Sequence, residues 1–73
     1  MTAKQVEHLV KMAEQIALNL GAGQGDAGAR GTAEHLRRFW TPAMCRRLTV
    51  FWREGGEVSA VVAAALQQLN EQQ

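Results

Sequence analysis

Residues 35–44 read HLRRFWTPAM, which places a histidine, two arginines, two large aromatic residues and the chain's one proline within ten positions. Thr41 followed by Pro42 is typical of a helix N-cap with proline at the first helical position, where the missing N–H costs nothing. The residue before a proline is also disfavoured in the helical conformation. The stretch therefore predicts one helix that ends near Trp40 and another that starts at Pro42.

Upstream of this stretch, apolar residues recur at three- and four-residue spacing between residues 6 and 20, which is typical of an amphipathic helix. We expect Thr2 to cap this first helix and Gly21 to end it. Residues 21–31 contain five glycines and predict a flexible surface loop. Thr32 is expected to cap the second helix.

Downstream, the third helix is expected to close at the Gly-Gly pair 55–56, and Ser59 is expected to cap an apolar fourth helix. The tail from Asn70 to Gln73 is expected to fray. No segment shows the alternation of a strand. We therefore predict an all-α fold in a single domain, residues 1–73, with about four short helices and a Gly-rich loop between the first two.

A chain of 73 residues forms a thin core, because it buries only about 60% of the surface of its unfolded chain. Cys45 is the one cysteine, so no internal disulfide can form. With the distant His8 and His35, it does not supply the four closely spaced ligands of a zinc site. Helical chains of this size are often completed by a partner, so we predict a partner protein and no metal.

The net charge of +1 conceals a basic middle. Residues 30–53 hold six arginines and one acidic residue, whereas residues 54–73 hold three acidic residues and no basic one. Such a middle can face nucleic acid, an acidic protein surface or water. We expect no secretory signal, and no apolar run approaches the roughly 20 residues of a membrane span. We expect a cytoplasmic protein without membrane contact. A free thiol is consistent with that reducing compartment.

Two features resemble chemical sites but lack the necessary surroundings. Residues 23–28 match the spacing GxGxxG, yet a dinucleotide site of this kind needs a preceding strand in a parallel sheet. His35 has no positioned acid, base or nucleophile around it, and Cys45 lies beside core positions, as a small buried hydrophobe does. We therefore predict no catalytic and no cofactor-binding residues.

Adjacent aromatic residues occur at 39–40 and at 51–52, and the two rings of each pair diverge by about 100° around a helix. One ring of each pair is expected to enter the core and the other to lie near the surface. Exposed aromatic rings beside arginine are typical of interface hot spots. We predict a partner-binding surface, called here the docking corner, that consists of His35, Arg37, Arg38, Phe39, Trp40, Pro42 and Met44.

Each part of the docking corner has an expected role. Arg37 and Arg38 would pair with acidic groups of the partner, Phe39 or Trp40 would anchor in a pocket, and Pro42 would fix the helix break. Truncation of Trp40 to alanine is expected to weaken assembly and to leave the helices of the isolated chain intact.

At these residues the chain resembles the delta subunit of cytoplasmic, NAD-dependent, molybdenum- or tungsten-containing formate dehydrogenases. The opening of that family resembles VEHLVKMAEQIA at residues 6–17. Its centre resembles H-[I/L]-R-[R/K]-F-W-x-P-x-M, which stands here at residues 35–44. A Gly-Gly pair before a last apolar helix stands at residues 55–56. The resemblance spans nearly the whole chain except the glycine loop.

This resemblance implies a non-catalytic accessory subunit that stabilises the formate dehydrogenase complex or helps to assemble it. The implied partner is the catalytic large subunit, which carries a bis-molybdopterin-guanine-dinucleotide (bis-MGD) centre of molybdenum or tungsten and iron–sulfur clusters. FMN and NAD are implied to belong to another subunit, and this chain is implied to hold no cofactor.

Two other functions remain open from the residues themselves. In a small DNA-binding regulator, the helices on either side of Pro42 would form a helix-turn-helix with arginines on phosphates, although residues 42–52 are more apolar than a recognition helix. In a self-associating homodimer, the aromatic rings would be buried against a second copy of the chain. The isolated chain would then form this homodimer without another partner.

Overall fold

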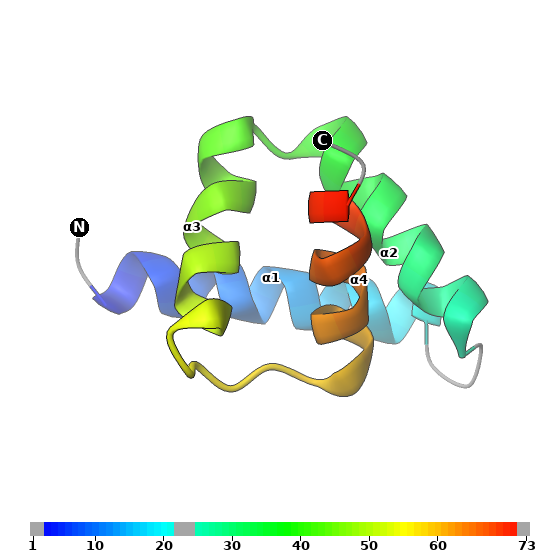
Figure 1. Ribbon diagram of the computed structural model, residues 1–73, viewed down its shortest axis with the longest axis horizontal. Helices are drawn as coiled ribbons and strands as arrows, with labels where there is room; N and C mark the ends of the chain where they lie inside the picture. The colour runs from blue at the N-terminus through cyan, green and yellow to red at the C-terminus, as the bar shows by residue number, and fades with distance from the viewer. Residues whose placement is uncertain (1–2, 22–24, 72–73) are drawn as a thin grey trace.

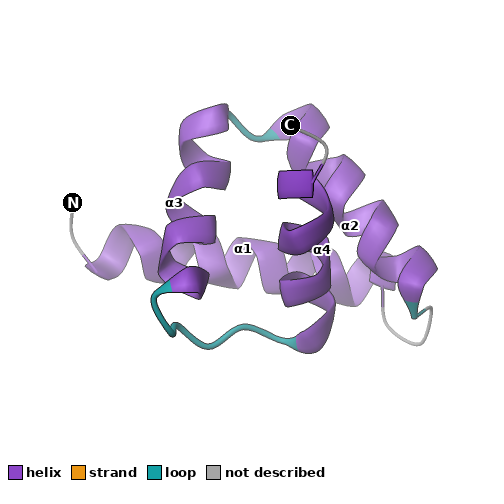
Figure 2. Ribbon diagram, in the orientation of Figure 1, coloured by secondary structure: helices purple, strands orange, loops and turns teal. Residues whose placement is uncertain are grey.

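The computed structural model describes residues 3–21 and 25–71, and nearly all of them lie in four helices (Figures 1 and 2). No strand occurs in these two ranges. The all-α prediction with four helices is confirmed. The helices are α1 (Ala3–Gly21), α2 (Asp26–Phe39), α3 (Pro42–Arg53) and α4 (Ala60–Glu71).

The helices pack across one another rather than in a parallel bundle. In Figure 1, α1 runs horizontally behind α3 and α4, which stand side by side across it, and α2 lies on the far side of α4 from α3. The most extensive contacts join α2 to α4 and α2 to α1. Within the described part of the chain, no helix has the length and apolarity needed to cross a membrane.

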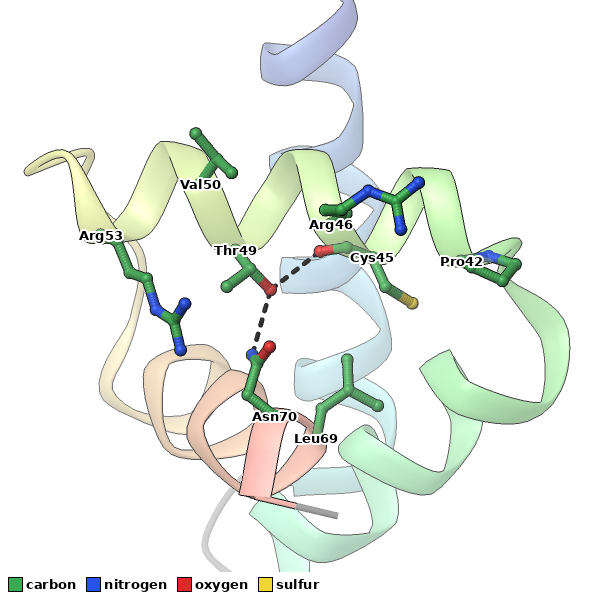
Figure 3. Close-up of a pocket in the computed structure, with 8 residues that line it drawn as sticks. All are labelled: Pro42, Cys45, Arg46, Thr49, Val50, Arg53, Leu69 and Asn70. Carbon is green, nitrogen blue, oxygen red and sulfur yellow. Dashed lines mark hydrogen bonds between the residues drawn. The ribbon is translucent and has the colours of Figure 1, made fainter. Parts of the chain in front are cut away.

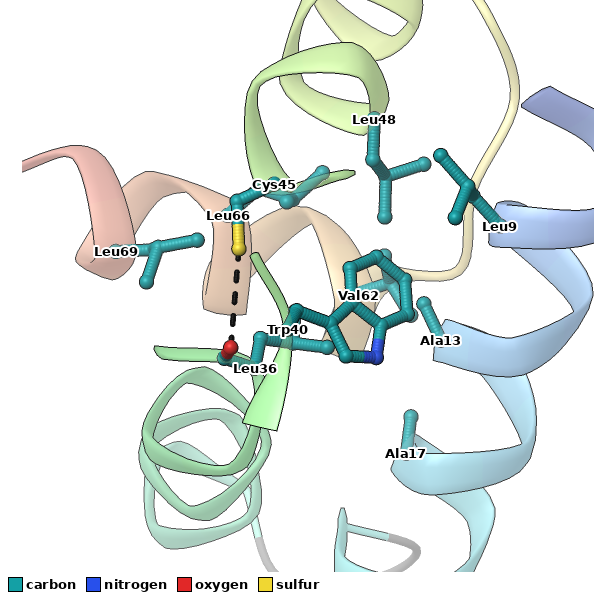
Figure 4. Packing of buried hydrophobic residues seen from close by; sticks show 10 residues of the cluster. All are labelled: Leu9, Ala13, Ala17, Leu36, Trp40, Cys45, Leu48, Val62, Leu66 and Leu69. Atoms are coloured by element: carbon teal, nitrogen blue, oxygen red, sulfur yellow. Dashed lines mark hydrogen bonds between the residues drawn. The ribbon is translucent and has the colours of Figure 1, made fainter. Parts of the chain in front are cut away.

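All four helices contribute to one apolar core, shown in Figure 4. Leu36, Leu48 and Leu66 are fully buried at its centre, one each from α2, α3 and α4. The side of α1 that faces them carries the small Ala13 and Ala17, so that the helices approach closely. The cluster consists of Leu9, Ala13, Ala17, Leu36, Trp40, Cys45, Leu48, Val62, Leu66 and Leu69.

The second helix begins at Asp26, six residues before the expected start at Thr32. Thr32 is not an N-cap but a buried residue inside α2, and its hydroxyl donates a hydrogen bond of 2.9 Å to the carbonyl oxygen of Gly28. Gly28, Ala29, Thr32 and Ala33 form a buried stripe of small residues. Burial of this stripe outweighs the low helix propensity of glycine, because tertiary packing supplies most of the stability of helices in proteins.

The predicted glycine loop is therefore wrong for residues 26–31, which are helical. Residues 22–24 lie outside the described residues, as does Thr2, the predicted cap of the first helix. Gly25 precedes α2 with a φ of +58°, a conformation that glycine adopts readily.

The predicted caps of the third and fourth helices are confirmed. The hydroxyl of Thr41 accepts a hydrogen bond of 3.2 Å from the backbone N–H of Met44, with Pro42 at the start of α3. The hydroxyl of Ser59 accepts one of 3.2 Å from the backbone N–H of Val62. The Ser59 N–H also donates to Oε2 of Glu14 at 2.7 Å, which ties the start of α4 to α1.

The Gly-Gly pair ends α3 as predicted. Gly55 has a φ of +99°, and its N–H donates to the carbonyl oxygen of Trp52 at 3.1 Å. The Gly56 N–H donates to the carbonyl oxygen of Phe51 at 2.9 Å. These two bonds and the positive φ form a Schellman motif, which satisfies carbonyl groups that the helix end leaves free.

The expected fraying of the tail is wrong for Asn70 and Glu71, which belong to α4. Asn70 is half-buried, and its amide donates hydrogen bonds to the carbonyl oxygen of Leu66 at 2.7 Å and to the hydroxyl of Thr49 at 3.2 Å. The second bond links the end of α4 to α3 (Figure 3). Residues 72–73 lie outside the described residues.

Candidate functional site: a protein-binding surface

The docking corner lies where α2 ends and α3 begins, and hydrogen bonds hold it on both sides of Thr41. The backbone N–H of Trp40 donates to the carbonyl oxygen of Leu36 at 2.9 Å, and that of Cys45 donates to the carbonyl oxygen of Thr41 at 3.1 Å. The Cys45 thiol donates to the same Leu36 carbonyl at 3.7 Å. The side chains around this turn are therefore presented by a well-supported backbone.

The two adjacent aromatic residues of the corner point to opposite environments. Trp40 is 8% exposed and its indole lies among core residues of α1, α3 and α4 (Figure 4), whereas Phe39 is 68% exposed. The prediction of one ring inside and one outside is confirmed for this pair. It is wrong for Phe51 and Trp52, which are both half-buried.

The sequence left open whether Phe39 or Trp40 is the exposed ring, and the structure distinguishes the two. The Phe39 ring is exposed to solvent, whereas the Trp40 ring is part of the core. Replacement of Trp40 by alanine would open a cavity in the core, so the expectation that the isolated helices survive this change does not fit its burial.

The exposed Phe39 ring lies against the imidazole of His35, with ring centroids 4.7 Å apart and planes tilted by 44°. Both rings line a shallow surface hollow of about 250 Å³, between the end of α1 and the second half of α2. Arg37 is exposed on the same last turn of α2. We call Arg37 and the residues that line this hollow the Phe39 surface. The hollow is lined by Leu20, Gly31, Glu34, His35, Arg38 and Phe39.

The remaining corner residues lie at two other places. Met44 is half-buried and lines a hollow between α1 and α3. Pro42 is exposed and lines a hollow between α3 and α4, shown in Figure 3. The structure thus brings His35, Arg38 and Phe39 together around one hollow, with Arg37 nearby on the last turn of α2. Trp40, Pro42 and Met44 are distributed over the core and two further surfaces.

The predicted docking corner leaves out two groups of exposed residues. Leu20 belongs to the apolar stripe of α1 but is exposed beside Phe39. On α3, Arg46, Arg47 and Val50 share an exposed face with Ala43. The signal for the second group was present, because positions 43, 46, 47 and 50 fall on one side of a helix.

Two observations on the described residues bear on reactivity and on metal binding. Cys45 is buried, and burial raises the pKa of its thiol, which makes it a poor nucleophile. Across residues 3–21 and 25–71, no three His, Cys, Asp or Glu side chains are grouped to hold a metal ion. Iron–sulfur clusters need several cysteine thiolates, so one buried cysteine does not fit such a group.

The chain matches the model of a known protein family. The family model of the NADH-dependent formate dehydrogenase delta subunit, FdsD, matches residues 8–66. No curated protein and no solved structure matches the chain. The matched span covers most of the structure described above, from the second turn of α1 into α4, and includes the whole docking corner.

Proposed function

The chain belongs to the NADH-dependent formate dehydrogenase delta subunit family, and on that premise we propose that it is a non-catalytic accessory subunit of the complex. It would bind the catalytic large subunit and stabilise it or assist its assembly. The bis-MGD molybdenum or tungsten centre, the iron–sulfur clusters, FMN and NAD would belong to other subunits. For the iron–sulfur clusters, the single buried cysteine supplies too few thiolates. The complex would be cytoplasmic, where the free thiol of Cys45 stays reduced.

The exposure of Phe39 carries this proposal. An aromatic ring that is 68% exposed lies beside Arg37 and Arg38, and it is the most exposed of the large apolar side chains in the described part of the chain. Burial of a phenylalanine side chain in a partner contributes about 1.5–3 kcal/mol. The neighbouring guanidinium groups suit carboxylates around the rim of the same contact.

The test is co-expression of the chain with a tagged catalytic large subunit, followed by measurement of the chain retained on the tag. Phe39→Ala is expected to lower its affinity for that subunit by roughly tenfold or more. Leu18→Ala is the matched control, since Leu18 is a similarly exposed apolar residue, 64% exposed, outside the Phe39 surface. Thermal unfolding should show that both variants are folded.

Equal retention of the Phe39→Ala and Leu18→Ala variants would remove Phe39 from the interface. Failure of the wild-type chain to bind the catalytic large subunit would overturn the accessory role. Sedimentation of the pure chain addresses the homodimer: a dimer that Phe39→Ala dissociates would assign the Phe39 surface to a second copy instead.

A further inference from the structure

The outward face of α3 forms a second surface, distinct from the Phe39 surface. Ala43, Arg46, Arg47 and Val50 line a shallow hollow of about 440 Å³ on it, and Val50 is 45% exposed. α3 contains no acidic residue at all. Its exposed side therefore combines a positive charge with small and aliphatic side chains.

This face continues into a groove between α1 and α3, because Ala43 and Arg47 line both hollows. Apolar side chains of Leu9 and Met44 line the groove, and Gln5 and His8 contribute from α1. Its volume of about 330 Å³ is at the lower end for ligand pockets, which suits one or two apolar side chains better than a cofactor. Among residues 3–21 and 25–71, no carboxylate lines either hollow.

Arg47 is already held in place across this groove. Its Nη1 donates a hydrogen bond of 2.8 Å to Oε1 of Gln5, so α1 orients the guanidinium of α3. Gln5 is neutral, so this hydrogen bond does not neutralise the positive charge of Arg47. A side chain that is ordered before binding loses less conformational entropy when the partner arrives.

We propose that the groove between α1 and α3, together with the outward face of α3, binds an acidic amphipathic segment of the catalytic large subunit. Apolar side chains of that segment would enter between Leu9 and Met44 and cover Val50, and its carboxylates would pair with Arg46 and Arg47. The apolar groove favours a protein segment over a nucleic acid, since phosphates need cations but no apolar cavity. The identity of the partner rests on the proposed function.

A photo-crosslinker tests the occupant directly. Benzoylphenylalanine is placed at position 50 of the full chain, the complex with the large subunit is illuminated, and the crosslinked peptides are identified by mass spectrometry. The expected product is a peptide of the large subunit with Asp or Glu on both sides of apolar residues. A product with a second copy of this chain, with a peptide that lacks acidic residues, or no product from an intact complex would overturn the proposal.

Charge reversal tests the electrostatic part. Arg46→Glu is expected to lower affinity for the large subunit by roughly tenfold at low salt, and this difference should shrink as salt is raised. Arg30→Glu is the control, because Arg30 is exposed on α2 outside both hollows and undergoes the same change of charge. Circular dichroism checks that both variants fold.

The two proposals fail separately. If the wild-type chain binds the large subunit and Arg46→Glu binds as well as Arg30→Glu, the groove assignment is wrong and the accessory role stands. If the wild-type chain does not bind that subunit, the accessory role itself is wrong. Tight binding of the wild-type chain to a DNA duplex, abolished by Arg46→Glu, would assign this face to nucleic acid and overturn the proposal.

Discussion

The thiol of Cys45 donates a hydrogen bond of 3.7 Å to the carbonyl oxygen of Leu36, and this contact joins the first turn of α3 to the last turn of α2 (Figure 4). The chain leaves the helical conformation between them, where Thr41 has a φ of −71° and a ψ of 156°. Cys45 thus spans the helix break while it fills a core position. The corner that presents Phe39 is consequently supported from the inside.

The buried thiol should be slow to react. Burial raises the pKa of Cys45, so little thiolate is present at neutral pH. We expect alkylation by iodoacetamide to be slower by roughly an order of magnitude or more in the native chain than in the chain unfolded in guanidinium chloride. Mass spectrometry of samples quenched over time measures both rates, and equal rates would contradict the burial of Cys45.

The same rise in the pKa of Cys45 makes the free energy of unfolding depend on pH in the alkaline range. The folded pKa of Cys45 lies above its ordinary value of 9.0, so the contribution of the protonated thiol is fully present below that value. As the pH rises beyond it, the unfolded chain releases the proton first, and the free energy of unfolding falls. Urea unfolding of the wild type and of Cys45→Ala is measured at pH values below and above 9.0. The free energy of unfolding should fall less with rising pH in the variant than in the wild type.

The hydrogen bonds of Asn70 should stabilise the end of α4. Asn70→Ala removes the donor to Thr49 and the donor to Leu66, and Thr49 is almost fully buried. We expect the free energy of unfolding to fall by about 1–2 kcal/mol. Gln67→Ala is the control, since Gln67 is exposed on the same helix, and urea unfolding measures both. An equal effect of the two changes would indicate that α4 ends before Asn70.

Two glycines should respond to alanine in opposite directions. Gly31 lies inside α2 with open space where a Cβ would stand, so Gly31→Ala should raise the free energy of unfolding by about 0.5–1 kcal/mol. A Cβ on Gly56 would meet the ring of Phe51, so Gly56→Ala should lower it by about 1–3 kcal/mol. Urea unfolding of the two variants gives both values. No gain from Gly31→Ala would argue that residues 26–31 are not helical.

The glycines of α2 also show which part of the fold could not be predicted from the sequence. The Thr41-Pro42 break, the Ser59 cap and the Gly55-Gly56 end depend on local backbone chemistry, and each was predictable from a few adjacent residues. The start of α2 depends instead on the burial of Gly28 and Thr32 against other helices. A local pattern carries no information about that packing, so the glycines were interpreted as a loop.

The candidate site shows the same division. Helical periodicity indicated that Phe39 and Trp40 point in different directions, but it did not indicate which ring is buried. That choice is made by α1, α3 and α4, whose side chains surround the indole. Likewise, the hollows that contain Met44 and Arg47 exist because α1 crosses α3, a relation between segments far apart in the sequence.

Replacement of Trp40 should mainly affect the stability of the chain, whereas replacement of Phe39 should mainly affect its assembly with a partner. Trp40→Ala should lower the free energy of unfolding by about 3–5 kcal/mol, because it empties the space between the core helices. In a domain of this size, such a loss removes much of the total stability. Phe39→Ala should change it by no more than about 0.5 kcal/mol, because the ring is mostly in solvent.

Circular dichroism during urea unfolding separates these effects from binding. The Phe39→Ala chain should be as helical as the wild type and yet be retained poorly by the catalytic large subunit. The Trp40→Ala chain should lose helicity in isolation, so that its poor retention follows from unfolding. If instead Trp40→Ala stays fully helical and fails to bind, the indole faces the partner, and the docking corner is centred one residue later than the structure indicates.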